Sequence, residues 1–213
     1  MSISRVKTWT SEVLTATDLN AEFENVVTNI LPAAGQSDVN TMTSNVLCLT
    51  PALNKIVLGT QAASTSGTSV TFSSIPSGVR RITIMLSGVS TSGTSNVMVQ
   101  IGDSGGLEAT GYLGAATTIA GATPATANFT TGFGVQATTA AGTISHGSIV
   151  LDLMDAATFT WAARAIVGHS NATNISIGAG VKALTAELTQ LAITTVGGAE
   201  TFDAGAINIS YER

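Results

Sequence analysis

The five residues Gly102-Asp103-Ser104-Gly105-Gly106 match a catalytic pattern, because a serine set among glycines is the surrounding of several nucleophiles. The pattern fits the nucleophile segment of chymotrypsin-like serine proteases and the looser Gly-x-Ser-x-Gly elbow of α/β-hydrolases. In a chymotrypsin-like enzyme the general-base histidine precedes the serine along the chain, whereas His146 and His169 both follow Ser104. The residue order therefore excludes the protease.

The residue order of an α/β-hydrolase can be written with Ser104 as the nucleophile, Asp152 or Asp155 as the acid and His169 as the base. That site requires a helix directly after the serine, but residues 107–114 contain two glycines and little helical periodicity. Residues 102–106 have the composition of a turn and lie between two predicted strands, so a β-turn is the simpler explanation of this segment. We therefore predict a β-turn at Ser104 and no catalytic residue.

No group of residues has the spacing of a metal or cofactor site. The chain has two histidines and one cysteine, Cys48, which excludes a multi-cysteine zinc site and an intramolecular disulfide. We predict that His169 lies in a loop after a strand, and that Asp152 and Asp155 act in a turn or as caps near a strand end. The Gly-Lys-Ser/Thr sequence of a phosphate loop does not occur. The sequence thus predicts no metal and no cofactor.

Composition narrows the classes of partner. The formal net charge is −5, and the few cations are dispersed, so there is no broad basic surface for nucleic acid. Mean hydropathy is positive, yet no run of about eighteen apolar residues occurs and the N-terminus lacks a signal-peptide pattern. We therefore expect no nucleic-acid binding, no membrane insertion and assembly in the cytoplasm. Only 10% of the residues are charged, which favours burial between subunits over a free monomer.

Strands are the elements that would position these residues. From Val70 onward, apolar residues alternate with small polar ones, and turn residues recur every eight to fifteen positions. Eight or nine such strands with no convincing helix between them predict an all-β domain over residues 66–213, an antiparallel β-sandwich of jelly-roll type. Trp161 falls on the inward face of the longest strand pattern, which alternates from Phe159 to Val167, so we predict a core role for it. The Ala/Thr/Gly-rich residues 114–127 are predicted to form a surface loop.

Residues 1–32 have a different pattern. Thr15 with Asp18 indicates a helix start, Leu19, Phe23, Val26 and Ile30 recur at spacings of four, three and four, and Pro32 ends the helix. So short a helix is marginal alone and needs a partner: the same helix of sister subunits, a groove on another protein, or its own domain. The predicted anchoring or oligomerisation residues are Trp9, Leu14, Leu19, Phe23, Val26 and Ile30. Residues 33–65 are predicted to be an extended linker with short strands.

Two stretches resemble structural proteins of tailed bacteriophages, especially fibre proteins. The first runs from Arg5-Val6-Lys7-Thr8-Trp9 through Leu14-Thr15-Ala16 to Asp18-Leu19-Asn20-Ala21-Glu22-Phe23. The second comprises Glu187-Leu188-Thr189-Gln190, Thr201-Phe202-Asp203-Ala204-Gly205 and Ile207-Asn208-Ile209, and is similar to the end of a β domain that recurs in such proteins. The resemblance implies attachment to the virion through the N-terminus, a trimeric state and a distal domain that faces solvent or host.

These observations together lead us to expect a non-enzymatic virion structural protein: a homotrimeric, tail-fibre-like component. Its expected partners are its own copies, other tail or capsid proteins, and a receptor or polysaccharide on the host surface. The alternative is a capsid decoration or head fibre protein. A hydrolytic tail enzyme is a third hypothesis, which would require clustered carboxylates or a working site at Ser104.

Overall fold

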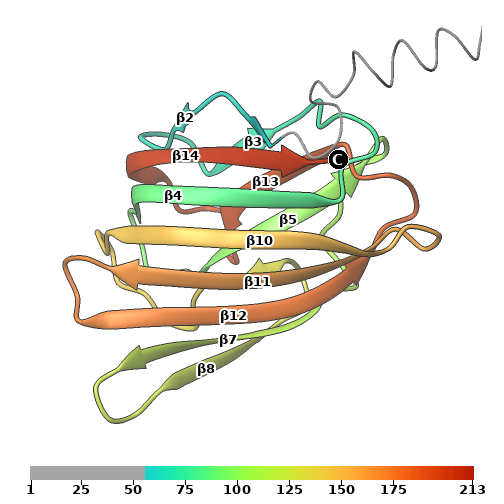
Figure 1. The fold of residues 1–213 in the computed structure, drawn as a ribbon. Helices are drawn as coiled ribbons and strands as arrows, with labels where there is room; N and C mark the ends of the chain where they lie inside the picture. The colour runs from blue at the N-terminus through green and yellow to red at the C-terminus, as the bar shows by residue number, and fades with distance from the viewer. Residues whose placement is uncertain (1–55) are drawn as a thin grey trace, which may run out of the picture. The chain divides into compact units, whose positions relative to one another are not determined.

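The structure, a computed structural model, describes residues 56–213, and all strand pairs in this part of the chain are antiparallel (Figure 1). The described residues contain no helix, and so none that could span a membrane. The prediction of an all-β domain is confirmed for this region. The predicted N-terminal helix, with Trp9, Leu14, Leu19, Phe23, Val26 and Ile30, and most of the predicted linker lie outside the described residues.

Nine strands form the larger of two sheets, here called the large sheet. Their order across the sheet starts at β1 and ends at the hairpin of β7 and β8, and β2 pairs with β14 beside β1. In that order the strands are β1 (Val57–Leu58), β2 (Ala62–Ala63), β14 (Phe202–Glu212), β4 (Arg81–Thr91), β10 (Ser145–Asp155), β11 (Thr160–His169), β12 (Asn174–Ala183), β7 (Leu113–Ala120) and β8 (Ala125–Phe129).

Five strands form the small sheet, which packs over part of the large one. Its order is β3 (Ser69–Phe72), β13 (Gln190–Thr195), β5 (Val97–Asp103) and β6 (Gly106–Leu107), and β9 (Phe133–Gly134) pairs with β5. All of β13 except its first residue is buried, because this strand is central in the small sheet.

The core lies between the two sheets and follows the predicted alternation. Side chains of one face of each strand point inward, which is what a period of two requires for a half-buried strand. The fully buried members include Ile82 and Ile84 of β4, Leu151 of β10 and Trp161 of β11. The predicted core role of Trp161 is thus confirmed, while Arg164 lies on the opposite, exposed face as expected.

The large sheet extends beyond the small one, and β9 covers part of the extension. A Cβ atom at Gly178 on β12 would collide with the carbonyl oxygen of Gly134 on β9, so two glycines allow the backbones to approach closely. Phe133 beside this contact is buried and meets the Tyr112 ring edge to face, with centroids 5.0 Å apart.

Three sequence predictions are wrong in detail. Residues 114–127 are not a loop but most of the hairpin of β7 and β8, in which Ala116 and Thr118 are buried although neither has a large apolar side chain. His169 is not in a loop: it is the last residue of β11 and is buried. Phe159 packs against the core as predicted, but it lies in the turn before β11, with φ of 49°, and not on the strand itself.

The two ends of the sandwich differ in charge. We call the end where residues 56 and 213 lie the terminal end, because Val57 pairs there with Tyr211 and Arg81 with Glu212. The far end carries the turns at residues 92–96, 121–124, 170–173 and 196–201; the turn joining β11 to β12 is on the left in Figure 1. Of the thirteen Asp, Glu, Lys and Arg residues in 56–213, all but Glu200 and Asp203 lie in the terminal half.

Candidate functional site

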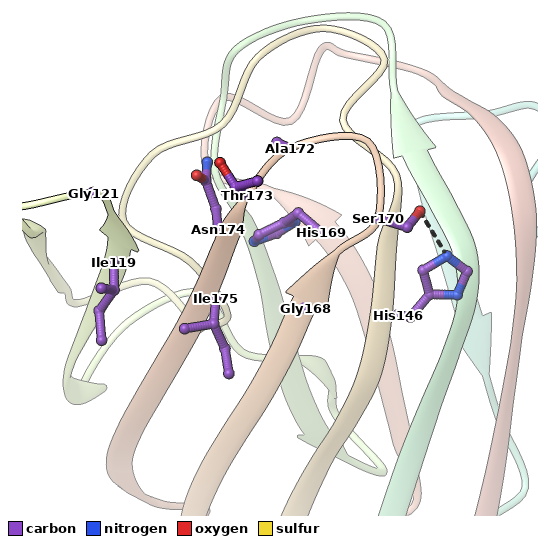
Figure 2. Close-up of a pocket in the computed structure, with 10 residues that line it drawn as sticks. All are labelled: Ile119, Gly121, His146, Gly168, His169, Ser170, Ala172, Thr173, Asn174 and Ile175. Carbon is purple, nitrogen blue, oxygen red and sulfur yellow. Dashed lines mark hydrogen bonds between the residues drawn. The ribbon is translucent and has the colours of Figure 1, made fainter.

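A groove crosses the far end of the large sheet on its outer face, the face turned away from the small sheet. Strand register places His146, Gly168, Ile175 and Ile119 in one row over β10, β11, β12 and β7. Gly168 lacks a side chain, and no other described residue lies within 4 Å of the point where its Cβ would be. The row therefore dips at Gly168, in a groove of about 650 Å³ (Figure 2).

The His146 imidazole is fixed on one side of the groove by two hydrogen bonds. The Gly88 backbone N–H donates to Nδ1 at 3.1 Å, and Nε2 lies 3.1 Å from the Ser170 hydroxyl oxygen. Because Nδ1 accepts, the proton of a neutral ring is on Nε2, which then donates to Ser170. The Ser170 hydroxyl proton is left to donate to another group. Figure 2 shows this pair to one side of the groove.

The turn after β11 supplies the remaining polar groups. The Asn171 side chain holds this turn to the neighbouring loop, because its Nδ2 donates to the Gly142 carbonyl at 2.7 Å and its Oδ1 accepts from the Ile144 N–H at 2.8 Å. The Thr173 and Asn174 side chains lie beside each other above Ile175 in Figure 2, with no hydrogen bond to another residue drawn there. A fixed turn thus presents a hydroxyl and an amide at the rim of the groove.

His169 lies beneath the groove within a directional hydrogen-bond network. Thr118 Oγ1 accepts from the backbone N–H groups of Ala137 and Thr138, so its own proton is left to donate. The nearer acceptor is Ser176 Oγ at 2.9 Å, and the Ser176 proton then points to His169 Nε2, also at 2.9 Å. This order leaves the proton of His169 on Nδ1, which lies 3.1 Å from Ser145 Oγ.

Both burial and this network favour the neutral imidazole of His169. Burial lowers the pKa of His169 below its ordinary value of 6.5, because the charged ring loses hydration. A proton on Nε2 would also displace the hydroxyl proton that Ser176 donates there, and would reverse the network.

The stability of the fold is therefore expected to depend on His169 in mildly acidic solution. In the unfolded chain His169 binds its proton near pH 6.5, whereas in the folded chain it binds the proton only at lower pH. The contribution of neutral His169 to the free energy of unfolding is therefore complete above pH 6.5 and is lost as the pH falls through the pKa of the folded state. We expect the free energy of unfolding to fall by at most about 1.4 kcal/mol per pH unit between pH 6.5 and 5. Urea unfolding at several pH values measures this slope.

Two histidine variants make the test specific. His169→Gln should flatten the pH dependence, whereas His146→Gln should keep it. Asp103, Asp152 and Asp155 have pKa values below 3.8, so their titration falls outside the pH range used. An equal slope for the wild type and His169→Gln would contradict the assignment.

The terminal end of the same outer face carries an ion-pair cluster of Glu212, Arg81, Asp152 and Arg164 on four adjacent strands. Arg81 Nε lies 2.6 Å from Asp152 Oδ1 and its Nη1 lies 3.7 Å from Glu212 Oε2; Arg164 binds the second oxygen of Asp152. Burial by itself would raise the pKa of Asp152, but the hydrogen bonds and charges of the two arginines outweigh it and hold the pKa below its ordinary value. Both carboxylate oxygens of Asp152 are thus bound by arginine side chains, those of Arg81 and Arg164.

The hypothetical hydrolase residues are not brought together. Ser104 lies in the tight turn between β5 and β6, as predicted, where Asp103 accepts from the Gly105 N–H at 2.8 Å and from the Thr185 hydroxyl at 2.6 Å. Asp152 pairs with Ala162, seven residues before His169 on β11, which is roughly 23 Å along a strand. These three residues form no triad.

Asp155 has the predicted turn role. Its carboxylate accepts from the Ala157 N–H at 2.9 Å and from the Thr158 hydroxyl at 2.7 Å, and these bonds lower its pKa. Among residues 56–213, no three His, Cys, Asp or Glu side chains gather as metal ligands would.

The groove itself was not predicted from the sequence. Its shape depends on a glycine that faces solvent between two larger side chains, and this follows only from the pairing of β10, β11, β12 and β7. The one local signal was the turn Ser170-Asn171-Ala172-Thr173, whose composition marks a polar connection. Comparisons with protein-family models, curated proteins and solved structures gave no match to this chain.

Proposed function

We propose that this chain is a non-enzymatic structural protein of a bacteriophage particle: a homotrimeric, tail-fibre-like component that attaches through residues 1–32 and presents the β domain outward. The resemblance of residues 5–31 and of the C-terminal stretch to phage structural proteins suggests the class. One structural observation carries the proposal, namely the apolar outer face of the large sheet, which no other part of residues 56–213 covers.

An apolar patch occupies the middle of that face, and neighbouring strands contribute to it. Ile166 of β11 lies opposite Ile177 of β12, with 56% and 44% of their surfaces exposed, and Leu113 of β7, 71% exposed, lies opposite Val181. The apolar patch consists of Leu113, Ala115, Ile166, Ile177, Ala179 and Val181. A contiguous surface of this kind on a soluble domain is typical of a binding interface.

A second copy of the chain is the occupant that the surroundings favour. The cluster of Glu212, Arg81, Asp152 and Arg164 borders the patch with two cations and two anions, so one face can be electrostatically complementary to another. The low proportion of charged residues in the whole chain also favours association of copies, because burial between copies removes apolar surface from water. Three copies around an axis close the assembly without an open end.

The order of the strands supports assignment to the jelly-roll class. Along the chain, the strands alternate between the sheets from β2 to β5. They alternate again over β9, β10, β13 and β14 when β11 and β12, which follow β10 in the large sheet, are set aside. The large sheet then contains the order β2-β14-β4-β10, and the small sheet contains β3-β13-β5-β9, so the first and last strands are neighbours. Two interlocked Greek keys of eight strands have this arrangement. The remaining strands β11, β12, β7 and β8 widen the large sheet.

The direction of attachment follows from where the chain joins the domain. Residue 56 lies at the terminal end, so a virion anchor built from Trp9, Leu14, Leu19, Phe23, Val26 and Ile30 connects to the domain there. The far end, whose turns at residues 92–96, 121–124, 170–173 and 196–201 contain Glu200 as their one charged residue, is then the end available to the host surface.

The test is to purify the particles of a virus that encodes the chain, count the copies of the chain by quantitative mass spectrometry and locate it by cryo-electron microscopy. We expect a small multiple of three copies in a three-fold density at the tail. Hundreds of copies spread over the capsid would replace this proposal with the decoration protein. Absence of the chain from the particles would overturn both.

A further inference from the structure

We propose that the far-end groove binds a neutral saccharide ring. This inference deepens the proposed function, since it names the chemistry of the host contact, but the binding itself can be measured without virus particles. The groove is the space above Gly168, between His146 on one side and Ile175 and Ile119 on the other. Its volume of about 650 Å³ is within the range of small-ligand sites.

The apolar wall matches the less polar face of a pyranose. Ile175 and Ile119 are opposite each other on β12 and β7, and 42% and 39% of their surfaces are exposed. Both side chains lie on the same side of the groove in Figure 2. A ring whose C–H groups pack on these two isoleucines removes apolar surface of both partners from water.

The polar groups match hydroxyls, which both donate and accept hydrogen bonds. Ser170 offers a donor, because its oxygen receives the proton of His146 Nε2. The Asn174 amide offers a donor and an acceptor, and the Thr173 hydroxyl offers both functions. These groups lie on a turn that Asn171 fixes to residues 142–144, so binding requires little ordering of the protein.

The charge distribution selects neutral sugars over acidic ones. Among residues 56–213, no Asp, Glu, Lys or Arg lines the groove. Both charged residues of the far half serve the protein itself: Glu200 accepts from the backbone N–H groups of Thr94 and Ser95, and Asp203 accepts from the Ser90 hydroxyl. A carboxylate or phosphate in the groove would lose hydration without gaining a positively charged partner.

The binding experiment uses the purified full-length chain and saturation-transfer NMR at pH 7.5. The probes are the methyl glycosides of glucose, galactose, mannose, rhamnose and N-acetylglucosamine, with those of galacturonic acid and sialic acid as the charged counterparts. We expect at least one neutral glycoside to give a signal at its ring protons, and both acidic ones to give at most one fifth of it.

Gly168→Leu fills the groove and tests its location. The new side chain meets open space, and the backbone at Gly168 is extended, so the fold should tolerate it. We expect the signal of the bound glycoside to fall at least fivefold, with an unchanged unfolding midpoint. Asn174→Ala should lower it about threefold. Ala183→Leu adds the same kind of bulk on an exposed position at the other end of β12 and should leave the signal unchanged.

Three results would overturn the inference: no signal from any neutral glycoside, an equal signal from the acidic ones, or a full signal in Gly168→Leu. A fall in molecular mass for Gly168→Leu would assign the groove to a contact between copies instead. If no glycoside binds in the NMR experiment but the chain still forms trimers and is incorporated into particles, only the saccharide inference is wrong. The proposed function is then unaffected.

Discussion

If the chain is the proposed homotrimer, replacing both Ile166 and Ile177 by glutamate is expected to convert it into a monomer. The two side chains face each other across β11 and β12 in the middle of the apolar patch. Three copies would bring six carboxylates into a surface that must lose water when the copies associate, and an unpaired buried charge costs several kcal/mol. Light scattering on the eluted peak should give a mass near 21.4 kDa, against three times that value for the unchanged chain.

The matched control is Val196→Glu, because Val196 is apolar and 50% exposed but lies in the turn between β13 and β14, outside the patch. This variant should remain a trimer. Both isoleucines point away from the core, so the double variant should also keep its unfolding midpoint at a concentration where the unchanged chain is monomeric. A trimeric double variant, or a monomeric unchanged chain at micromolar concentration, would contradict the assignment of this face.

Trp161→Ala is expected to lower the free energy of unfolding by about 3–5 kcal/mol. Trp161 is the largest fully buried side chain, and it lies beside a cavity of about 160 Å³ also lined by Val79, Leu153 and Leu188. Removing the indole would enlarge a space that is already present at the terminal end of the core. Neighbouring strands hold the surrounding backbone, so the site can collapse only in part.

Trp161→Phe is the control, and its expected loss is about 1–2 kcal/mol. The indole Nε1 is buried and has no hydrogen-bond partner among the described residues, so phenylalanine keeps much of the apolar contact and removes an unpaired donor. Urea unfolding monitored by far-ultraviolet circular dichroism gives both values. Equal losses for the two variants would mean that the indole nitrogen has a partner after all.

The inward faces of the long strands could be predicted from the sequence because strong strand residues mark them. Ile82, Ile84 and Leu86 in β4 recur with a period of two and mark its core face. Val97, Val99 and Ile101 mark the core face of β5 in the same way, although Met98 on its other face is buried as well. The hairpin of β7 and β8 could not be predicted in the same way, since Ala116 and Thr118 acquire their burial from β12 and the chain around β9. His169 was misplaced for a related reason, because its two serine partners lie on different strands.

The candidate site depended even more on pairing between strands. Neither the opening above Gly168 nor the row that it interrupts follows from the residues around it in the chain. Conversely, the predicted turn at Ser104 needed only local composition, and it is confirmed. A turn set by neighbouring residues could thus be predicted from the sequence, while a surface formed by four paired strands could not.

The turns of the far end can change in sequence and length without altering the core. Residues 170–173 join two strands whose register is set by ten consecutive pairs, so the strand ladder rather than the turn holds these strands in place. Insertions at such exposed turns are tolerated because the flanking ladders already hold the strands. Under the proposed function, a phage could therefore acquire a new host specificity through a few turn mutations, while the same β domain continues to fold and assemble.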